Sequence, residues 1–444
     1  MRNTQLKFSI LSMRLFSTNS PEVYVGFGEA VLRSLPSDNG LYMPEQIPTL
    51  DDGFWVDWKA LDFQEMAYRV VSSMLQGVIP EPELRSIVTD AVNFSAPVVR
   101  LDDSHHVLEL FHGPTLAFKD FGARFMARVM AWLNRDSTKP LTVLVATSGD
   151  TGGAVAHAFH NVPGTRVIIL YPSGKVSGLQ EKQLTALGGN ITALEIDGSF
   201  DDCQRMVKAA FLDKDVAKSC NLTSANSINI SRLIPQMLYY FEAARQFEEP
   251  PVFVIPSGNF GNLTALLLAT RMGLKVGHIV AATNINDVVP EYLSSSKYEP
   301  RPSVATLSNA MDVGAPSNFA RMIEIFGGEW QAMAQRICGF SYNDEQTRAA
   351  MREVYEKYDY VMDPHGAVAY LAAQAWLSKH PEDVTVILET AHPAKFPETI
   401  EDELGSAVLE TPERLACLAD QPKVSIAMEA KDAMLISWLH AHPA

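Results

Sequence analysis

Two segments of the sequence repeat one pattern, a buried strand, a glycine-rich turn and a helix, and this repeat restricts the possible folds most strongly. The turns are Ser148-Gly-Asp-Thr-Gly-Gly153 and Ser257-Gly-Asn-Phe-Gly-Asn262, which share Ser-Gly-(Asp/Asn)-x-Gly. The strands before them, at residues 141–146 and 252–255, are almost continuously apolar, which is typical of parallel strands buried on both faces. We therefore predict an α/β fold whose parallel sheets are doubly wound by helices.

The same alternation continues through the central part of the chain. Helices are predicted at residues 154–159, 201–212 and 263–272, and further strands at 167–171, 191–196, 275–283 and 384–390. The segment before about residue 96 is expected to be mostly helical and to form a separate layer. The tail beyond about residue 407 is expected to be helical.

The composition excludes several classes of function. The chain has 444 residues, a net charge of −16 and 47% hydrophobic residues, so it can form more than one packed domain. An acidic chain is poorly suited to nucleic acid, because binding phosphates requires clustered Lys and Arg. No apolar run reaches the roughly 20 residues of a membrane-spanning helix. An anionic substrate would need a locally basic pocket in this acidic chain.

Cysteine and histidine patterns give no sign of a metal site. The four cysteines are Cys203, Cys220, Cys338 and Cys417, and none of them form a CxxC pair. The histidines form no HExxH motif. This pattern argues against a disulfide framework and a zinc site, and it favours a reducing compartment. We therefore expect no metal and a cytoplasmic location.

The first residues differ in composition from the rest of the chain. Arg2, Lys7 and Arg14 occur with several Ser and Thr, and no acidic residue precedes Glu22. This composition is that of a transit peptide, but no long amphipathic stretch accompanies it. A disordered extension over residues 1–12, or an early start codon with Met13 as the true start, is the simpler interpretation.

Lys119 lies in an apolar and aromatic segment, Phe111-His-Gly-Pro-Thr-Leu-Ala-Phe-Lys-Asp-Phe-Gly122. Desolvation disfavours an ammonium ion, so the pKa of a lysine in such surroundings falls. A neutral amine is the form that condenses with an aldehyde. On composition alone, a lysine whose charged end extends from a core helix to solvent is an equally good explanation.

The two glycine-rich turns are candidate anion sites. Glycine lets a backbone approach a ligand closely, and the following helix presents free N–H groups and the positive end of its dipole. Neither turn ends in the Gly-Lys-Ser/Thr of a nucleotide-binding loop, and Lys175 after Ser173-Gly is followed by Val176. A nucleotide site is therefore disfavoured. For either turn alone, plain topology is also an explanation.

Two further segments carry polar groups at expected element ends. Thr390 and His392 follow a predicted strand, at the edge where open α/β sheets bind ligands, although a structural role for such a histidine is the commoner one. Arg232 closes Ser224-Ala-Asn-Ser-Ile-Asn-Ile-Ser-Arg232 and suits bidentate phosphate binding. Helix capping by Ser and Asn, with an exposed Arg, explains that segment equally well.

Together and in this order, the motifs resemble those of the threonine synthases, a family of fold-type II enzymes that use pyridoxal phosphate. The resemblance rests on the Lys119 segment and on Thr147-Ser-Gly-Asp-Thr-Gly152, Asn226-Ser-Ile-Asn-Ile-Ser-Arg232, Ser257-Gly-Asn-Phe-Gly261 and Thr390-Ala-His-Pro-Ala-Lys-Phe396. It extends from about Met13, where related chains begin, to the C-terminal region.

The resemblance implies how the cofactor is held. Lys119 would form its Schiff base, and Thr390 would face its pyridine nitrogen. The cofactor phosphate would lie on the turn formed by Gly258, Asn259, Phe260, Gly261 and Asn262. Many relatives have Asn at the position of Asp150, in contact with the 3′ oxygen of the cofactor. A carboxylate would repel a phenolate there, so we do not give Asp150 this role, and Asn226 is a possible substitute.

The resemblance also implies how the substrate is held. Ser148 and Thr151 would meet the substrate carboxylate. Arg232 is the main candidate for the leaving phosphate, with Lys175 and Ser148 as weaker candidates.

An organisation and an activity follow from the same resemblance. Residues 13–95 would form an N-terminal helical segment, and residues 96–125 with 226–410 would form a large cofactor-binding domain. Residues 126–225 would form a small α/β domain, and residues 411–444 a helical tail. The reaction would be γ-elimination of phosphate from O-phosphohomoserine and β-addition of water, giving L-threonine. A pyridoxal phosphate lyase that releases a 2-oxo acid, or a non-catalytic homologue, is the alternative. A monomer and a homodimer both remain open.

Overall fold

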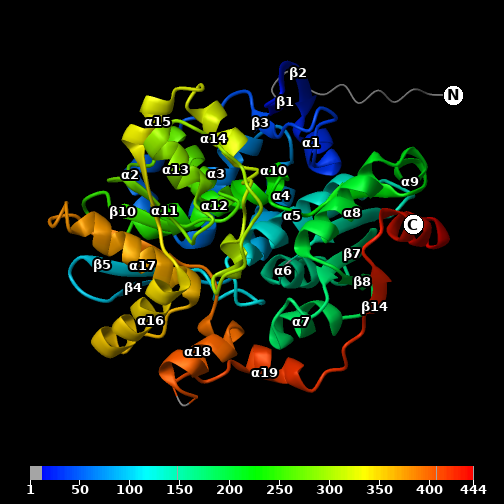
Figure 1. Ribbon diagram of the computed structural model, residues 1–444. Coiled ribbons are helices and arrows are strands. Elements are labelled where there is room, and N and C mark those ends of the chain that lie inside the picture. The colour runs from blue at the N-terminus through cyan, green and yellow to red at the C-terminus, as the bar shows by residue number, and fades with distance from the viewer. Residues whose placement is uncertain (1–12, 148, 407, 444) are drawn as a thin grey trace.

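The computed structural model describes residues 13–443 except 148 and 407. Two largely parallel sheets lie in these residues (Figure 1). Helices α5 (Lys119–Asn134) and α6 (Asp150–Phe159) share one apolar core with both sheets. The predicted α/β class is confirmed. The predicted extension at residues 1–12 and the candidate residue Ser148 lie outside the described residues.

The larger sheet has six strands in the order β12-β11-β10-β13-β5-β4, and only β4 runs antiparallel to its neighbour. Its strands are β4 (Val98–Arg100), β5 (His105–Glu109), β10 (Val252–Pro256), β11 (Ile279–Thr283), β12 (Ile337–Ser341) and β13 (Thr385–Glu389). Val254 packs in a core with α16 (Asp344–Tyr358) and α17 (Pro364–Leu377), whereas Phe253 packs in the core that includes α11 (Leu238–Ala244) and α12 (Gly261–Arg271). Alternate side chains therefore bury both faces, which explains the continuous apolar run.

The smaller sheet has five parallel strands in the order β14-β8-β7-β6-β9. Four of its strands are β6 (Leu141–Ala146), β7 (Thr165–Pro172), β8 (Ile191–Asp197) and β9 (Asn221–Ser224). Val143 and Val145 pack in the core with α5 and α6, and Leu144 packs on the other face with α8 (Phe200–Leu212) and α20 (Asp432–Ala441). Helices α7 (Gly178–Thr185) and α9 (Lys214–Ser219) complete the connections.

The fifth strand of this sheet comes from the C-terminal tail. Strand β14 (Ile426–Glu429) pairs in parallel with β8, with Ile426 opposite Leu194. The prediction of a helical tail was therefore wrong for these residues, although α19 (Glu413–Ala419) and α20 are helical. Only Met428 of β14 is buried, and the apolar part of the strand is limited to residues 426–428, which is too short to indicate a strand.

The N-terminal segment combines predicted helices with a three-stranded antiparallel sheet of order β2-β1-β3, which was not predicted. Its strands are β1 (Arg14–Ser17), β2 (Ser20–Gly26) and β3 (Tyr42–Pro44). Its helices are α1 (Phe27–Arg33), α2 (Asp52–Asp57), α3 (Phe63–Leu75) and α4 (Glu81–Ala91). Because β2 is exposed along most of its length, it lacks the alternation that marks a strand.

The remaining helices surround the larger sheet or connect the two sheets. They are α10 (Ile230–Leu233), α13 (Val288–Ser295), α14 (Phe319–Ile325), α15 (Trp330–Arg336) and α18 (Pro397–Leu404). Short 3₁₀ turns complete the set: η1 (Trp58–Ala60), η2 (Ile234–Met237), η3 (Asn309–Met311) and η4 (Pro393–Lys395). Within the described residues, none of the helices combines the length and the apolar character needed to cross a membrane.

Candidate active site

Backbone pairing brings the lysine segment against the end of β13. The amide of Phe118 donates to Thr390 O at 2.9 Å, and the amide of His392 donates to Leu116 O at 3.0 Å. Ala117 and Ala391 form an antiparallel bridge between these two bonds. Two motifs far apart in the sequence therefore meet, and Lys119 begins α5 next to Thr390.

The Lys119 side chain lies in a largely dry environment and is only 15% exposed. The pKa of Lys119 is lowered to about 8, mainly by burial. The carboxylate of Asp150 opposes this shift, and the cations Lys395 and Arg232 contribute to it. The distance from Lys119 Nζ to Asp150 Oδ2 is 3.8 Å. A substantial fraction of this amine is thus neutral near physiological pH, which agrees with the prediction from the apolar segment.

A second lysine lies beside the first and was not predicted. Lys395 is fully buried, and its Nζ lies 2.6 Å from Asp150 Oδ1 and donates to Thr115 O at 2.9 Å. Gln180 Nε2 donates to the same Asp150 oxygen at 2.9 Å. Burial alone would raise the pKa of Asp150, but the ammonium groups of Lys395 and Lys119 hold it well below its usual range. Asp150 is therefore an ionised carboxylate between two lysines.

Arg232 approaches α5 one turn after Lys119. A Cβ at Gly122 would lie 2.9 Å from Arg232 Nε, so the glycine leaves room for the guanidinium. Arg232 is 3% exposed, and its Nη1 donates to Ala225 O at 2.7 Å. Its buried Nε has no hydrogen-bond partner among the described residues. Burial lowers the pKa of Arg232 to about 10. The alternative of an exposed arginine in this segment is excluded, although Asn229 does cap α10.

The turn between β10 and α12 leaves a row of backbone amides free. Among the described residues, no acceptor is bonded to the amides of Gly258, Asn259, Phe260, Gly261 and Asn262. A Cβ at Gly258 would lie 2.4 Å from Ala310 O, so this position requires glycine. The Phe260 backbone is left-handed, with φ of +57°. Free amides at the beginning of a helix form an anion site.

Side chains of the same turn hold it in place. Asn259 Nδ2 donates to Ser227 Oγ at 2.7 Å, and Asn259 Oδ1 accepts from the Ser317 amide at 2.5 Å. Asn262 Nδ2 donates to Pro256 O at 2.9 Å. The two amide side chains are thus occupied, and the backbone N–H groups remain for a ligand.

In the turn between β6 and α6, three glycine amides find acceptors within the turn itself. Thr147 Oγ1 accepts from the Gly149 amide at 3.0 Å and from the Gly152 amide at 2.7 Å. The Gly153 amide donates to Gly149 O at 3.2 Å. This turn presents the Asp150 carboxylate to the site, and the sequence pattern gave no signal for the role of the Thr147 hydroxyl.

Not all of the other predicted residues lie near Lys119. Asn226 Nδ2 donates to Ala146 O at 3.0 Å, at the entry to the turn that contains Thr151. Lys175 is exposed after β7, and its ammonium makes no ion pair with a described residue. His392 Nδ1 accepts from the Ala394 amide at 3.1 Å, and burial lowers the pKa of His392 to about 4, which agrees with the structural role. Lys175 is therefore not brought into the Lys119 cluster.

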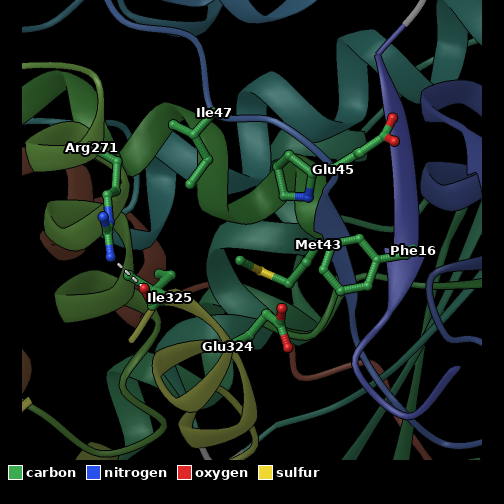
Figure 2. Close-up of a pocket in the computed structure, with 8 residues that line it drawn as sticks. Phe16, Met43, Glu45, Ile47, Arg271, Glu324 and Ile325 are labelled. Atoms are coloured by element: carbon green, nitrogen blue, oxygen red, sulfur yellow. Dashed lines mark hydrogen bonds between the residues drawn. The ribbon is translucent and has the colours of Figure 1, made fainter. Parts of the chain in front are cut away.

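Two hollows lie outside this cluster. One, of about 450 Å³, is drawn in Figure 2 and is lined by Phe16, Met43, Pro44, Glu45, Ile47, Arg271, Glu324 and Ile325. The other, of about 470 Å³, lies behind the lysine segment, and its lining includes His112, Thr115 and Arg414. Neither contains Lys119, Arg232 or a residue of the turn at 257–262.

The chain is similar to characterised families along almost its whole length. Residues 14–92 match the family described as threonine synthase N terminus, and residues 97–390 match pyridoxal-phosphate dependent enzyme. Residues 366–437 match threonine synthase, C-terminal.

Individual relatives extend this similarity. The threonine synthase of Escherichia coli strain K12 is 44% identical over 435 residues, which is 97% of this chain and 100% of the relative. The crystal structure of threonine synthase from Escherichia coli superposes with a TM-score of 0.91, over 97% of this chain and 100% of that chain. The structure of threonine synthase with bound pyridoxal phosphate from Brucella melitensis is 33% identical and also has a TM-score of 0.91, over 97% and 100% of the two chains.

Proposed function

Because the chain belongs to the threonine synthase family of pyridoxal-phosphate-dependent lyases, we propose that it converts O-phosphohomoserine and water into L-threonine and phosphate. The observation that carries this proposal is the arrangement around Lys119. A largely buried amine of lowered pKa lies near a buried arginine, in a chain that also has a turn with free amides. These groups suit an aldehyde and two phosphates.

The residues of the site fit the cofactor. Lys119 offers an amine for the aldehyde, and the amides from Gly258 to Asn262 offer donors for the phosphate. Thr390, which is 6% exposed, offers a hydroxyl that can face the ring nitrogen without adding charge. When bound, the cofactor supplies an electron sink for carbanions.

Lys119 is proposed to move protons during the reaction. Once displaced from the cofactor by the substrate amine, it would remove a proton at the substrate Cα and exchange protons at Cβ. A pKa of about 8 suits both directions of transfer, because such an amine accepts and returns a proton near neutral pH. Burial of the surrounding segment keeps bulk water from competing for these protons.

Arg232 is proposed to bind the phosphate that leaves. The net charge of −16 repels anions in general, so a phosphorylated substrate requires a local cation. A buried guanidinium stabilises developing negative charge more strongly than an exposed one. Thr151, Asn226 and Ser148 are proposed to contact the rest of the substrate, and Lys175 is a weaker candidate because it is exposed.

The deciding experiment measures threonine and phosphate after incubation of the purified protein with O-phosphohomoserine and pyridoxal phosphate. We expect the two products in equal amounts, and no threonine from Lys119→Ala. Borohydride reduction should fix the cofactor to the protein, and peptide mapping should locate the attachment at Lys119. Release of a 2-oxo acid and ammonia would favour the lyase alternative, and absence of any product would favour a non-catalytic homologue.

The role of Arg232 has a separate test. Arg232→Gln should raise KM for O-phosphohomoserine and lower kcat, because the guanidinium would contact the phosphate in both the bound and the reacting state. The visible absorbance of the bound cofactor should persist. Unchanged kinetics would remove Arg232 from the phosphate site.

The cytoplasmic location and the choice between monomer and homodimer stay predictions.

A further inference from the structure

The ion pair between Asp150 and Lys395 joins the two halves of the molecule at the site. Asp150 begins α6, directly after the turn that follows the small-sheet strand β6, and Lys395 ends η4, shortly after the large-sheet strand β13. Their charged atoms lie 2.6 Å apart and both side chains are buried. Ser177 Oγ also donates to Lys395 O at 3.3 Å. The pair is thus fixed from both sides.

The pair sets the charge that Lys119 experiences. Asp150 lies 3.8 Å from Lys119 Nζ, and an isolated carboxylate at this distance would hold Lys119 as an ammonium. Lys395 lies closer to Asp150 than Lys119 does, and it compensates the carboxylate. The other charges that act on Lys119 are the cation Arg232 and the anion Asp363.

Lys395 is poorly placed to bind the substrate itself. It is fully buried, and its ammonium is held by Asp150 Oδ1 and by Thr115 O. His365 is a further group that lowers the pKa of Asp150, with a smaller effect than the two lysines. His365 is itself held by Asp363, with its Nδ1 2.8 Å from Oδ1. Lys395 therefore acts on the site through Asp150.

We propose that Lys395 is a positioning residue that neutralises Asp150, so that Lys119 remains a free amine for the cofactor aldehyde and the carboxylate does not repel the anionic cofactor. The Lys119 nitrogen bonds to the aldehyde carbon, and water leaves, only when the nitrogen carries no proton. This inference rests on the proposed function for the identity of the aldehyde.

The test measures the protonation of Lys119 in the apoenzyme, without cofactor. Trace acetylation over a range of pH, followed by peptide mass spectrometry, gives the midpoint at which Lys119 becomes reactive. Lys395→Met should raise this midpoint by about one pH unit, so that labelling at neutral pH slows about tenfold. The double variant Lys395→Met/Asp150→Asn should return the midpoint towards the wild-type value, because both charges are removed.

Two further variants keep the test decisive. Asp150→Asn alone should shift the midpoint downwards, because it leaves Lys395 positive beside Lys119, and this variant serves if Lys395→Met does not fold. Lys423→Met is the matched control, since Lys423 pairs with Glu181 and Glu195 at 2.7 and 2.8 Å in a different cluster. An unchanged midpoint in both Lys395→Met and Asp150→Asn overturns the proposal. Because no cofactor is used, failure of the proposed reaction would leave these midpoints unaffected.

Discussion

At the end of β10, the amides of residues 258–262 have no acceptor among the described residues, whereas at the end of β6 the amides of Gly149 and Gly152 are bound by Thr147. The third residue of the shared pattern differs as well. It is the neutral Asn259 in the turn after β10 and the ionised Asp150 in the turn after β6. The same five-residue pattern therefore forms an anion receptor in one place and a carboxylate bound to two lysines in the other. The difference between the two turns depends on whether a side chain of the turn itself binds the backbone amides.

The largest expected effect is on cofactor affinity, and it should distinguish a glycine substitution in one turn from the equivalent substitution in the other. In Gly258→Ala the new Cβ would lie 2.4 Å from Ala310 O, and in Gly152→Ala it would lie 2.5 Å from Thr147 Cγ2. The two distances are similar, but the new Cβ at Gly258 meets backbone atoms and the one at Gly152 meets a side chain. Only the first substitution displaces the free amides. We expect Gly258→Ala to weaken pyridoxal phosphate binding about a thousandfold, through loss of two charge-assisted hydrogen bonds.

Gly152→Ala is the matched control for that measurement. Equilibrium titration of the apoenzyme should give a cofactor affinity within about threefold of the wild type. Equal losses in both variants would mean that the turns do not differ in the way described.

A smaller effect is expected when the third residue is exchanged. Asn259→Asp places a carboxylate in the turn with the free amides, while the hydroxyl of Ser227 and the amide of Ser317 can still bond to it. Repulsion between this carboxylate and the cofactor phosphate should weaken binding about a hundredfold, and added salt should reduce the loss. Asn259→Ser, which removes the amide side chain without adding charge, is the control. A loss as large in Asn259→Ser would indicate that geometry, not charge, is responsible.

The smallest effect concerns the other turn. Thr147→Val keeps the shape of the side chain but leaves the amides of Gly149 and Gly152 without their acceptor. The free energy of unfolding should fall by about 2 kcal/mol, measured by urea denaturation of the apoenzyme. Thr147→Ser retains the hydroxyl and should lose much less. A stable Thr147→Val protein would show that water replaces the hydroxyl at no cost.

Local chemistry predicted part of this site well. The apolar segment around Lys119 indicated a lowered pKa, and burial is indeed its main cause. For Arg232 the sequence left two explanations, since a capping segment and a phosphate-binding segment use the same residue types. The structure combines them: Asn229 caps α10, and Arg232 is buried against Gly122.

Contacts between distant segments could not be predicted in this way. Lys395 is part of the motif at residues 390–396, but nothing near it in the sequence indicates that its partner is Asp150. The exposed strands β2 and β14 were missed because strand prediction depends on buried alternation. Lys175, in contrast, follows a strand like the other candidates but points to solvent. Sequence patterns thus identify reactive residues better than the charges that regulate them.

The pairing of β14 with β8 has a consequence for biosynthesis on the ribosome. Strand β8 is translated long before Ile426, so one edge of the small sheet has open hydrogen-bonding groups while most of the chain emerges. Leu435 and Leu439 of α20 then cover an apolar face made by β6, β7 and β8. A nascent chain that stalls before these residues should be a preferred client of chaperones that recognise open strand edges.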